Sequence, residues 1–147
     1  MKKHDEGYVL AYVTVVLLVF CLVAATILTG ALRNLNNQQA AIAKMEDQYV
    51  AAGEIEKVIA SLDALIAGKA TSSVEITCSD AILAEWDAEE KMLTLTANCG
   101  VVVVSCGLNM EGAYVTQKTE NEKVTSVTIS NLSAYTYAFY EIGGVSE

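Results

Sequence analysis

The stretch YVLAYVTVVLLVFCLVAATILTG, residues 8–30, decides the fold of this chain because it contains no charged side chain. About 20 apolar residues in an α-helix cover the roughly 30 Å hydrocarbon thickness of a bilayer. The preceding segment, MKKHDEG at residues 1–7, is polar and too short to form a domain. We therefore expect a membrane-spanning helix followed by one modest domain.

The charges that flank residues 8–30 favour a cytoplasmic N-terminus, because Lys2 and Lys3 precede the apolar run. A secretory signal peptide has an apolar core of about 7–15 residues and then a cleavage site. This longer run leads directly into a helical pattern, so we expect a retained single-pass anchor with the distal domain outside the cytoplasm. The alternative is an ordinary signal anchor and a separate short helix, with a break at residues 33–39, RNLNNQQ.

Beyond the apolar run, apolar residues recur at gaps of three and four, which predicts that the helix continues with one apolar face. The residues of this predicted stripe are Ile42, Met45, Tyr49, Ala52, Ile55, Ile59, Leu62 and Ile66. Gly68 is a typical C-terminal stop for a helix. The sequence therefore predicts a membrane and filament-core helix over residues 8–32 and an amphipathic continuation over residues 33–67.

After Gly68 the apolar period changes to two, which predicts short strands joined by tight turns. The predicted strands are residues 74–78, 82–86, 93–97, 101–104, 113–118, 124–130 and 135–142. We expect residues 101–104 to form a central strand buried on both faces, and residues 107–112 to form a loop. No connection is long enough for a crossover helix, so the strands must pair antiparallel. The predicted fold class is α+β, with the long N-terminal helix packed on an antiparallel β domain over residues 68–147.

Charge and composition argue against several classes of function. The net charge of −9 and the lack of a Lys/Arg cluster predict no direct nucleic-acid binding. The single histidine, His4, lies in the leader, so the distal domain has no Ser/His or Cys/His pair, and we expect neither an enzyme nor a cofactor. The aromatic cluster at residues 135–140 is typical of a core and sheet face, with a partner surface as the alternative.

Four cysteines are present, and Cys21 lies in the apolar run. In an exported domain a disulfide is plausible. Extended chain separates Cys99 from Cys106 by roughly 23 Å, whereas bridged Cα atoms lie about 4.4–6.8 Å apart. The sequence therefore favours a disulfide of Cys78 with Cys99 or Cys106, with free buried thiols as the alternative. No Cys/His pair has the spacing of a metal site.

This layout of leader, apolar segment, amphipathic helix and C-terminal sheet resembles a type IV pilin or pseudopilin. The leader resembles a class III signal, which implies that a prepilin peptidase cuts between Gly7 and Tyr8. The family usually has Glu at the fifth mature position, whereas this chain has Tyr12, which resembles the minor, tip-type members. The stretch YVAAGEIE, residues 49–56, is similar to the segment after the membrane helix in PilX-like minor pilins and tip pseudopilins of type II secretion. Small size and few cysteines also resemble minor pseudopilins of Gram-positive competence systems.

The resemblance implies a minor structural subunit of a type IV pilus-like, type II secretion-like or competence filament, held in the cell membrane before assembly. Its implied partners are other pilin or pseudopilin subunits through the N-terminal helix, a prepilin peptidase and the membrane. The competing hypothesis is a plain single-pass membrane protein with an extracytoplasmic sensing or adhesion β domain.

Overall fold

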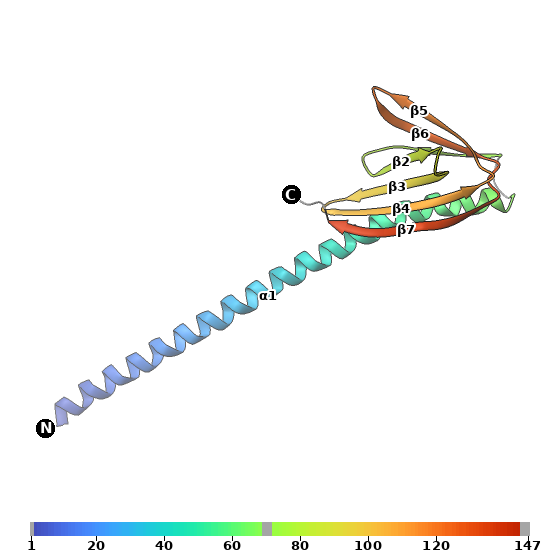
Figure 1. The fold of residues 1–147 in the computed structure, drawn as a ribbon. Coiled ribbons are helices and arrows are strands. Elements are labelled where there is room, and N and C mark those ends of the chain that lie inside the picture. Colours follow the sequence, from blue (N-terminus) through green and yellow to red (C-terminus); the bar gives the residue numbers. More distant parts are fainter. Residues whose placement is uncertain (1, 69–71, 145–147) are drawn as a thin grey trace. The chain divides into compact units, whose positions relative to one another are not determined.

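The computed structural model describes residues 2–68 and 72–144, so Met1 of the predicted leader lies outside the described residues (Figure 1). The chain divides into two compact units, Met1–Ile42 and Ala43–Glu147, each of which is described by itself. Helix α1, Lys2–Ile66, begins in the first unit and ends in the second. It runs without interruption through residues 33–39, so the helix has no break at the position where the sequence allowed one.

The end of α1 follows the predicted stop. Ala67 and Gly68 form a turn in which their N–H groups donate to the carbonyls of Asp63 and Leu65, at 2.9 and 3.2 Å. Gly68 has a φ of +68°, a left-handed conformation that glycine adopts without the steric cost of a Cβ. The helix therefore ends because its last carbonyls find partners in a glycine turn.

Seven strands follow among the described residues, and they match the seven predicted ones in order. They are β1 (Ser73–Thr77), β2 (Ile82–Asp87), β3 (Met92–Cys99), β4 (Val102–Glu111), β5 (Tyr114–Glu120), β6 (Lys123–Ser130) and β7 (Ala134–Gly144). All five strand pairs are antiparallel. They form a three-stranded sheet of order β1-β6-β5 and a four-stranded sheet of order β2-β3-β4-β7. The α+β fold class is confirmed.

Tight turns set the register of the hairpins. Asn121 and Glu122 join β5 to β6 with φ angles of 50° and 65°, as in a type I′ turn, whose twist matches that of the flanking strands. Between β2 and β3, the Asp87 carboxylate accepts hydrogen bonds from the N–H groups of Glu89 and Glu90 at 2.8 and 3.2 Å. The predicted tight turns therefore form, and Glu89 and Glu90 are exposed.

The predictions for residues 101–112 were wrong in two respects. Val101 is exposed in the turn before β4, and only one face of β4 is fully buried, because the other face of the sheet lies toward solvent. Residues 107–111 belong to β4 rather than to a loop. Gly107 fits the strand because the ring of Phe139 occupies the space that a Cβ would need there, while Gly112, at φ +68°, makes the actual turn.

A single apolar core lies in the second unit, between the end of α1 and the two sheets. Figure 1 shows this end of the helix lying along the four-stranded sheet. Ile55 and Leu62 of α1 are fully buried in one cluster with residues of β1 to β4 and β6, including Leu95 and Ile129. Burial of each such side chain stabilises the fold by roughly 1.5–3 kcal/mol.

The predicted helical stripe was partly wrong. Ile55 and Leu62 are buried as expected, but Met45 and Tyr49 are exposed, and Ala51 is buried instead. Three full helical turns take about 10.8 residues, whereas Ile55 follows Met45 by only ten residues. At about 100° per residue, the Met45 side chain therefore points roughly 80° away from the direction of the buried Ile55. The observed row is residues 51, 55, 58, 62 and 65, whose alternating gaps of four and three keep to one face.

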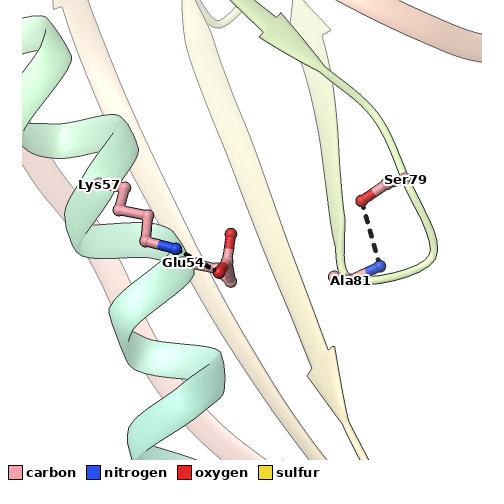
Figure 2. Close-up of polar contacts among 4 residues, drawn as sticks. All are labelled: Glu54, Lys57, Ser79 and Ala81. Carbon is pink, nitrogen blue, oxygen red and sulfur yellow. Dashed lines mark hydrogen bonds and ion pairs between the residues drawn. The ribbon is translucent and has the colours of Figure 1, made fainter.

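Local polar contacts order the surface of this unit. In the connection from β1 to β2, the Ser79 hydroxyl accepts a hydrogen bond from the Ala81 N–H at 3.3 Å (Figure 2). On α1, Lys57 and Glu54 form an ion pair at 2.7 Å, at the spacing of neighbours on one helix face. Both contacts are exposed, so each contributes little to stability.

Candidate functional site

The first unit presents an apolar surface on all sides of α1. Tyr8 is 79% exposed and Phe20 is 70% exposed, and nearly every large apolar residue between them is also exposed. Proteins in water rarely expose contiguous apolar patches beyond a few hundred Å². A helix that is hydrophobic all round is typical of a membrane span or of a helix buried among others. Helix α1 is long and apolar enough to cross a membrane.

The threonine hydroxyl groups in this surface donate hydrogen bonds within the helix itself. Thr14, Thr26 and Thr29 donate hydrogen bonds to backbone carbonyls three or four residues earlier, each at 2.8 Å. In lipid no water is available to these groups. Moving a polar atom from water into lipid without an internal hydrogen-bond partner would therefore cost roughly several kcal/mol of free energy. These threonines therefore fit a non-aqueous surrounding. Sequence reasoning missed this feature, although each threonine has a carbonyl within one helical turn.

The predicted processing site lies at the start of the same surface. Helix α1 continues through Gly7 and Tyr8, and Tyr8 is exposed. A Cβ at Gly7 would meet no atom within 4 Å, and the same is true of Gly30. Glycine inside a helix costs about 1 kcal/mol relative to alanine, so packing gives no reason for glycine at position 7. Tyr12, at the fifth position after Gly7, is also exposed.

The three distal cysteines, Cys78, Cys99 and Cys106, are free in the structure. The Cys78 sulfur contacts the backbone of Ala84 on β2, whereas Cys106 is buried on β4. Cys99 ends β3, and the pairing of Cys78 with Cys99 or Cys106 stays a prediction.

Cys99 takes part in a contact between α1 and the turn from β3 to β4. Its thiol donates to the Asp47 carboxylate at 3.5 Å. Burial raises the pKa of the Cys99 thiol, and the hydrogen bond to Asp47 raises this pKa further. Gly100, at φ +57°, lies so close to Asp47 that a Cβ would clash with the carboxylate. The raised pKa favours the neutral thiol, which is less nucleophilic than the thiolate.

A second contact joins the last turns of α1 to the start of β7. The Tyr135 hydroxyl donates to the Asp63 carboxylate at 2.6 Å. Burial is the largest cause and this hydrogen bond the second of a shift that raises the pKa of Tyr135 to about 12. The Tyr135 ring meets the ring of Tyr137 edge to face, with centroids 6.1 Å apart. The two partners lie far apart in the sequence, so no local spacing could have predicted the pair.

The aromatic cluster of β7 has some members in the core and others exposed, and the sequence allowed either a core face or a partner surface. Tyr135 packs against the core, and the Phe139 ring lies over Gly107 of β4. Tyr137 and Tyr140 are about half exposed. Within the described residues 2–68 and 72–144, no group of three or more His, Cys, Asp or Glu side chains is placed to hold a metal ion.

No protein-family model, curated protein or solved structure matches this chain.

Proposed function

We propose that this chain is a minor structural subunit of a type IV pilin-like filament. The observation that carries the proposal is the all-round apolar surface of α1 in the first unit, with its threonine hydroxyls bonded internally. Such a surface can be covered by lipid before assembly and by the equivalent helices of neighbouring subunits afterwards. Pilus-like, type II secretion-like and competence filaments are all compatible with this arrangement.

The physical basis of assembly would be an exchange of neighbours around α1. Lipid tails are as apolar as leucine side chains, so helices associate in membranes through close packing rather than through the hydrophobic effect. The β domain would stay in water, where the acidic character of the chain, with a net charge of −9, favours its solubility. The extracytoplasmic position of this domain follows from the lysines that precede the span.

Processing by a prepilin peptidase between Gly7 and Tyr8 is part of the proposal. It is supported by a glycine at position 7 that packing does not require. Gly7→Val should block cleavage and leave residues 1–7 attached. Gly30→Val is the matched control, since Gly30 lies in the same helix with equally open space around its Cα.

The experiment is to express both variants with the native chain in cells that carry a prepilin peptidase, and to measure the intact mass of each product. We expect the native chain and Gly30→Val to begin at Tyr8 and Gly7→Val to keep the leader. If all three products keep residues 1–7, the processing claim fails. Normal piliation, secretion and transformation after deletion of the gene would count against the filament function.

A second candidate is a single-pass membrane protein with an extracytoplasmic sensing or adhesion domain. The observation in its favour is Tyr12, which replaces the Glu usual in the resembled family. Under this alternative, Tyr8 never becomes an N-terminus and the protein stays out of fibres. N-terminal sequencing of protein from membrane and fibre fractions distinguishes the two.

A further inference from the structure

The two edges of the four-stranded sheet differ in how their backbone groups are satisfied. Along β2, three alternate residues have partners from the same chain. These bonds run from the Ser79 N–H to the Ile82 carbonyl (2.8 Å), from the Ala84 N–H to the Cys78 sulfur (3.4 Å) and from the Trp86 N–H to the Gln117 side chain (3.1 Å). Alternate residues are the ones that point their backbone groups outward from an antiparallel edge strand. The β2 edge is therefore closed to a further strand.

The opposite edge, formed by β7, is open. This strand has 11 residues, and its partner is β4. Among the described residues, no backbone hydrogen bond reaches β7 from any other segment. Native proteins usually protect such edges with proline, lysine, a β-bulge, a short strand or a covering element. Strand β7 contains neither proline nor lysine, and its one irregularity is a bulge at Ala138. Its length and openness therefore fit an edge that accepts another strand.

Aromatic side chains line this edge on the side that faces α1. Tyr137 is 54% exposed, Tyr140 46% and Ile142 49%. They pair with Leu108, Cys106 and Val104 of β4, which are buried, so the β7 residues continue the core face outward to the edge. An added strand would find apolar and aromatic contacts there as well as backbone hydrogen bonds.

The charges near this edge are negative. Glu56 of α1 is close enough to Tyr137 and Tyr140 to raise the pKa of both phenols, after the larger effect of burial. Asp63 acts on Tyr137 in the same way, and Glu141 lies on β7 itself. Strands β4 and β7 contain no Lys or Arg. Lys57 of α1 is paired with Glu54 (Figure 2).

We propose that the β7 edge docks an extended, lysine- or arginine-rich segment of another protein, which adds to the sheet as a further antiparallel or parallel strand. Backbone hydrogen bonds would provide affinity, as in other cases of strand addition. The tyrosine faces and the carboxylates of Glu56 and Asp63 would select cationic side chains on the face toward α1. Glu141 alternates with Tyr140 and Ile142 along β7, so it would select a cationic side chain on the opposite face of the added strand. A second copy of this chain fits less well, because each copy carries a net charge of −9. The inference does not depend on the filament proposal.

The test uses the full chain in nonionic detergent micelles and a fluorescent peptide of about eight alternating lysine and valine residues, the length of an ordinary strand. Binding is measured by anisotropy, and the docking site by amide hydrogen exchange. The key variant is Glu141→Lys. Its matched control is Glu85→Lys, an exposed residue on β2, the closed edge of the same sheet. A peptide that alternates glutamate and valine is the second control.

We expect the cationic peptide to bind and to slow amide exchange in β7 but not in β2. An exposed ion pair changes affinity by up to roughly fivefold. Glu141→Lys replaces this attraction by a repulsion between two positive charges, so it should weaken peptide binding by about tenfold. Glu85→Lys should bind like the native chain, and the acidic peptide should not bind.

Four results would overturn the proposal. Equal weakening by both variants would mean general attraction to an acidic protein. Binding without protection of β7 would place the peptide elsewhere. Protection of β7 that grows with protein concentration in the absence of peptide would make the occupant a second copy of the chain. Absence of binding at millimolar peptide would also refute the proposal, whether or not the chain enters filaments.

Discussion

The two halves of α1 differ in what covers their apolar side chains. In the unit Met1–Ile42, residues such as Leu18 are exposed all round the helix, whereas in the unit Ala43–Glu147 residues such as Leu62 are fully buried against the sheets. Both halves are equally helical, so helicity does not distinguish them. The difference teaches that the second half finds its packing partners within its own domain, while the first half has the all-round apolar surface that is typical of a helix covered by lipid or by other helices.

The largest expected effect comes from truncating one leucine in each half. Leu62→Ala should lower the free energy of unfolding of the β domain by about 2–5 kcal/mol, because it leaves a cavity in the core. Leu18→Ala should change it by less than about 0.5 kcal/mol. Urea unfolding of the full chain in nonionic micelles, followed by fluorescence of the single tryptophan, Trp86, measures both. Equal losses would show that the halves are not distinct in packing.

An intermediate effect is expected from glycine replacements within the second unit. Gly100→Ala should lower the free energy of unfolding by about 1–3 kcal/mol, because a left-handed φ is strained for alanine and the added Cβ displaces Asp47. Gly53→Ala, in open space on α1, should stabilise by about 0.5–1 kcal/mol through helix propensity. The same unfolding assay reports both, and a stabilising Gly100→Ala would refute the close contact between α1 and the β3–β4 turn.

The smallest effect concerns the bond between α1 and β7. Tyr135→Phe should cost about 1 kcal/mol, since the hydrogen bond to Asp63 is partly exposed. The raised pKa means that the folded state favours the neutral phenol. The stabilisation is therefore complete below about pH 10 and is lost as pH rises through about 12.

The difference in stability between the native chain and Tyr135→Phe should accordingly shrink between these pH values. Tyr114→Phe is the control, because Tyr114 on β5 is exposed and its hydroxyl donates no hydrogen bond among the described residues. A pH-independent difference for Tyr135→Phe would show that the contact with Asp63 does not form.

Sequence periodicity predicted the helix, the glycine stop and all seven strands, because each depends on local patterns of residues. It misplaced Met45 and Tyr49 of α1, since two overlapping apolar rows share Ile55 and Leu62 and only the sheets select between them. It also read residues 107–112 as a loop, because the ring of Phe139 that fills the space above Gly107 comes from a distant strand. Long-range pairs and open edges depend on strand order, which periodicity does not specify.

The most direct measurement of the central claim uses Cys21, which lies in the middle of the apolar half of α1. The full chain in lipid nanodiscs is treated with a charged, water-soluble maleimide, and modification of each cysteine is read by mass spectrometry. Val101→Cys supplies a thiol at an exposed turn of the β domain as the internal standard. We predict that the thiol at position 101 reacts while Cys21 stays unmodified until the disc is dissolved in SDS. Reaction of Cys21 at the same rate as the standard would contradict the account.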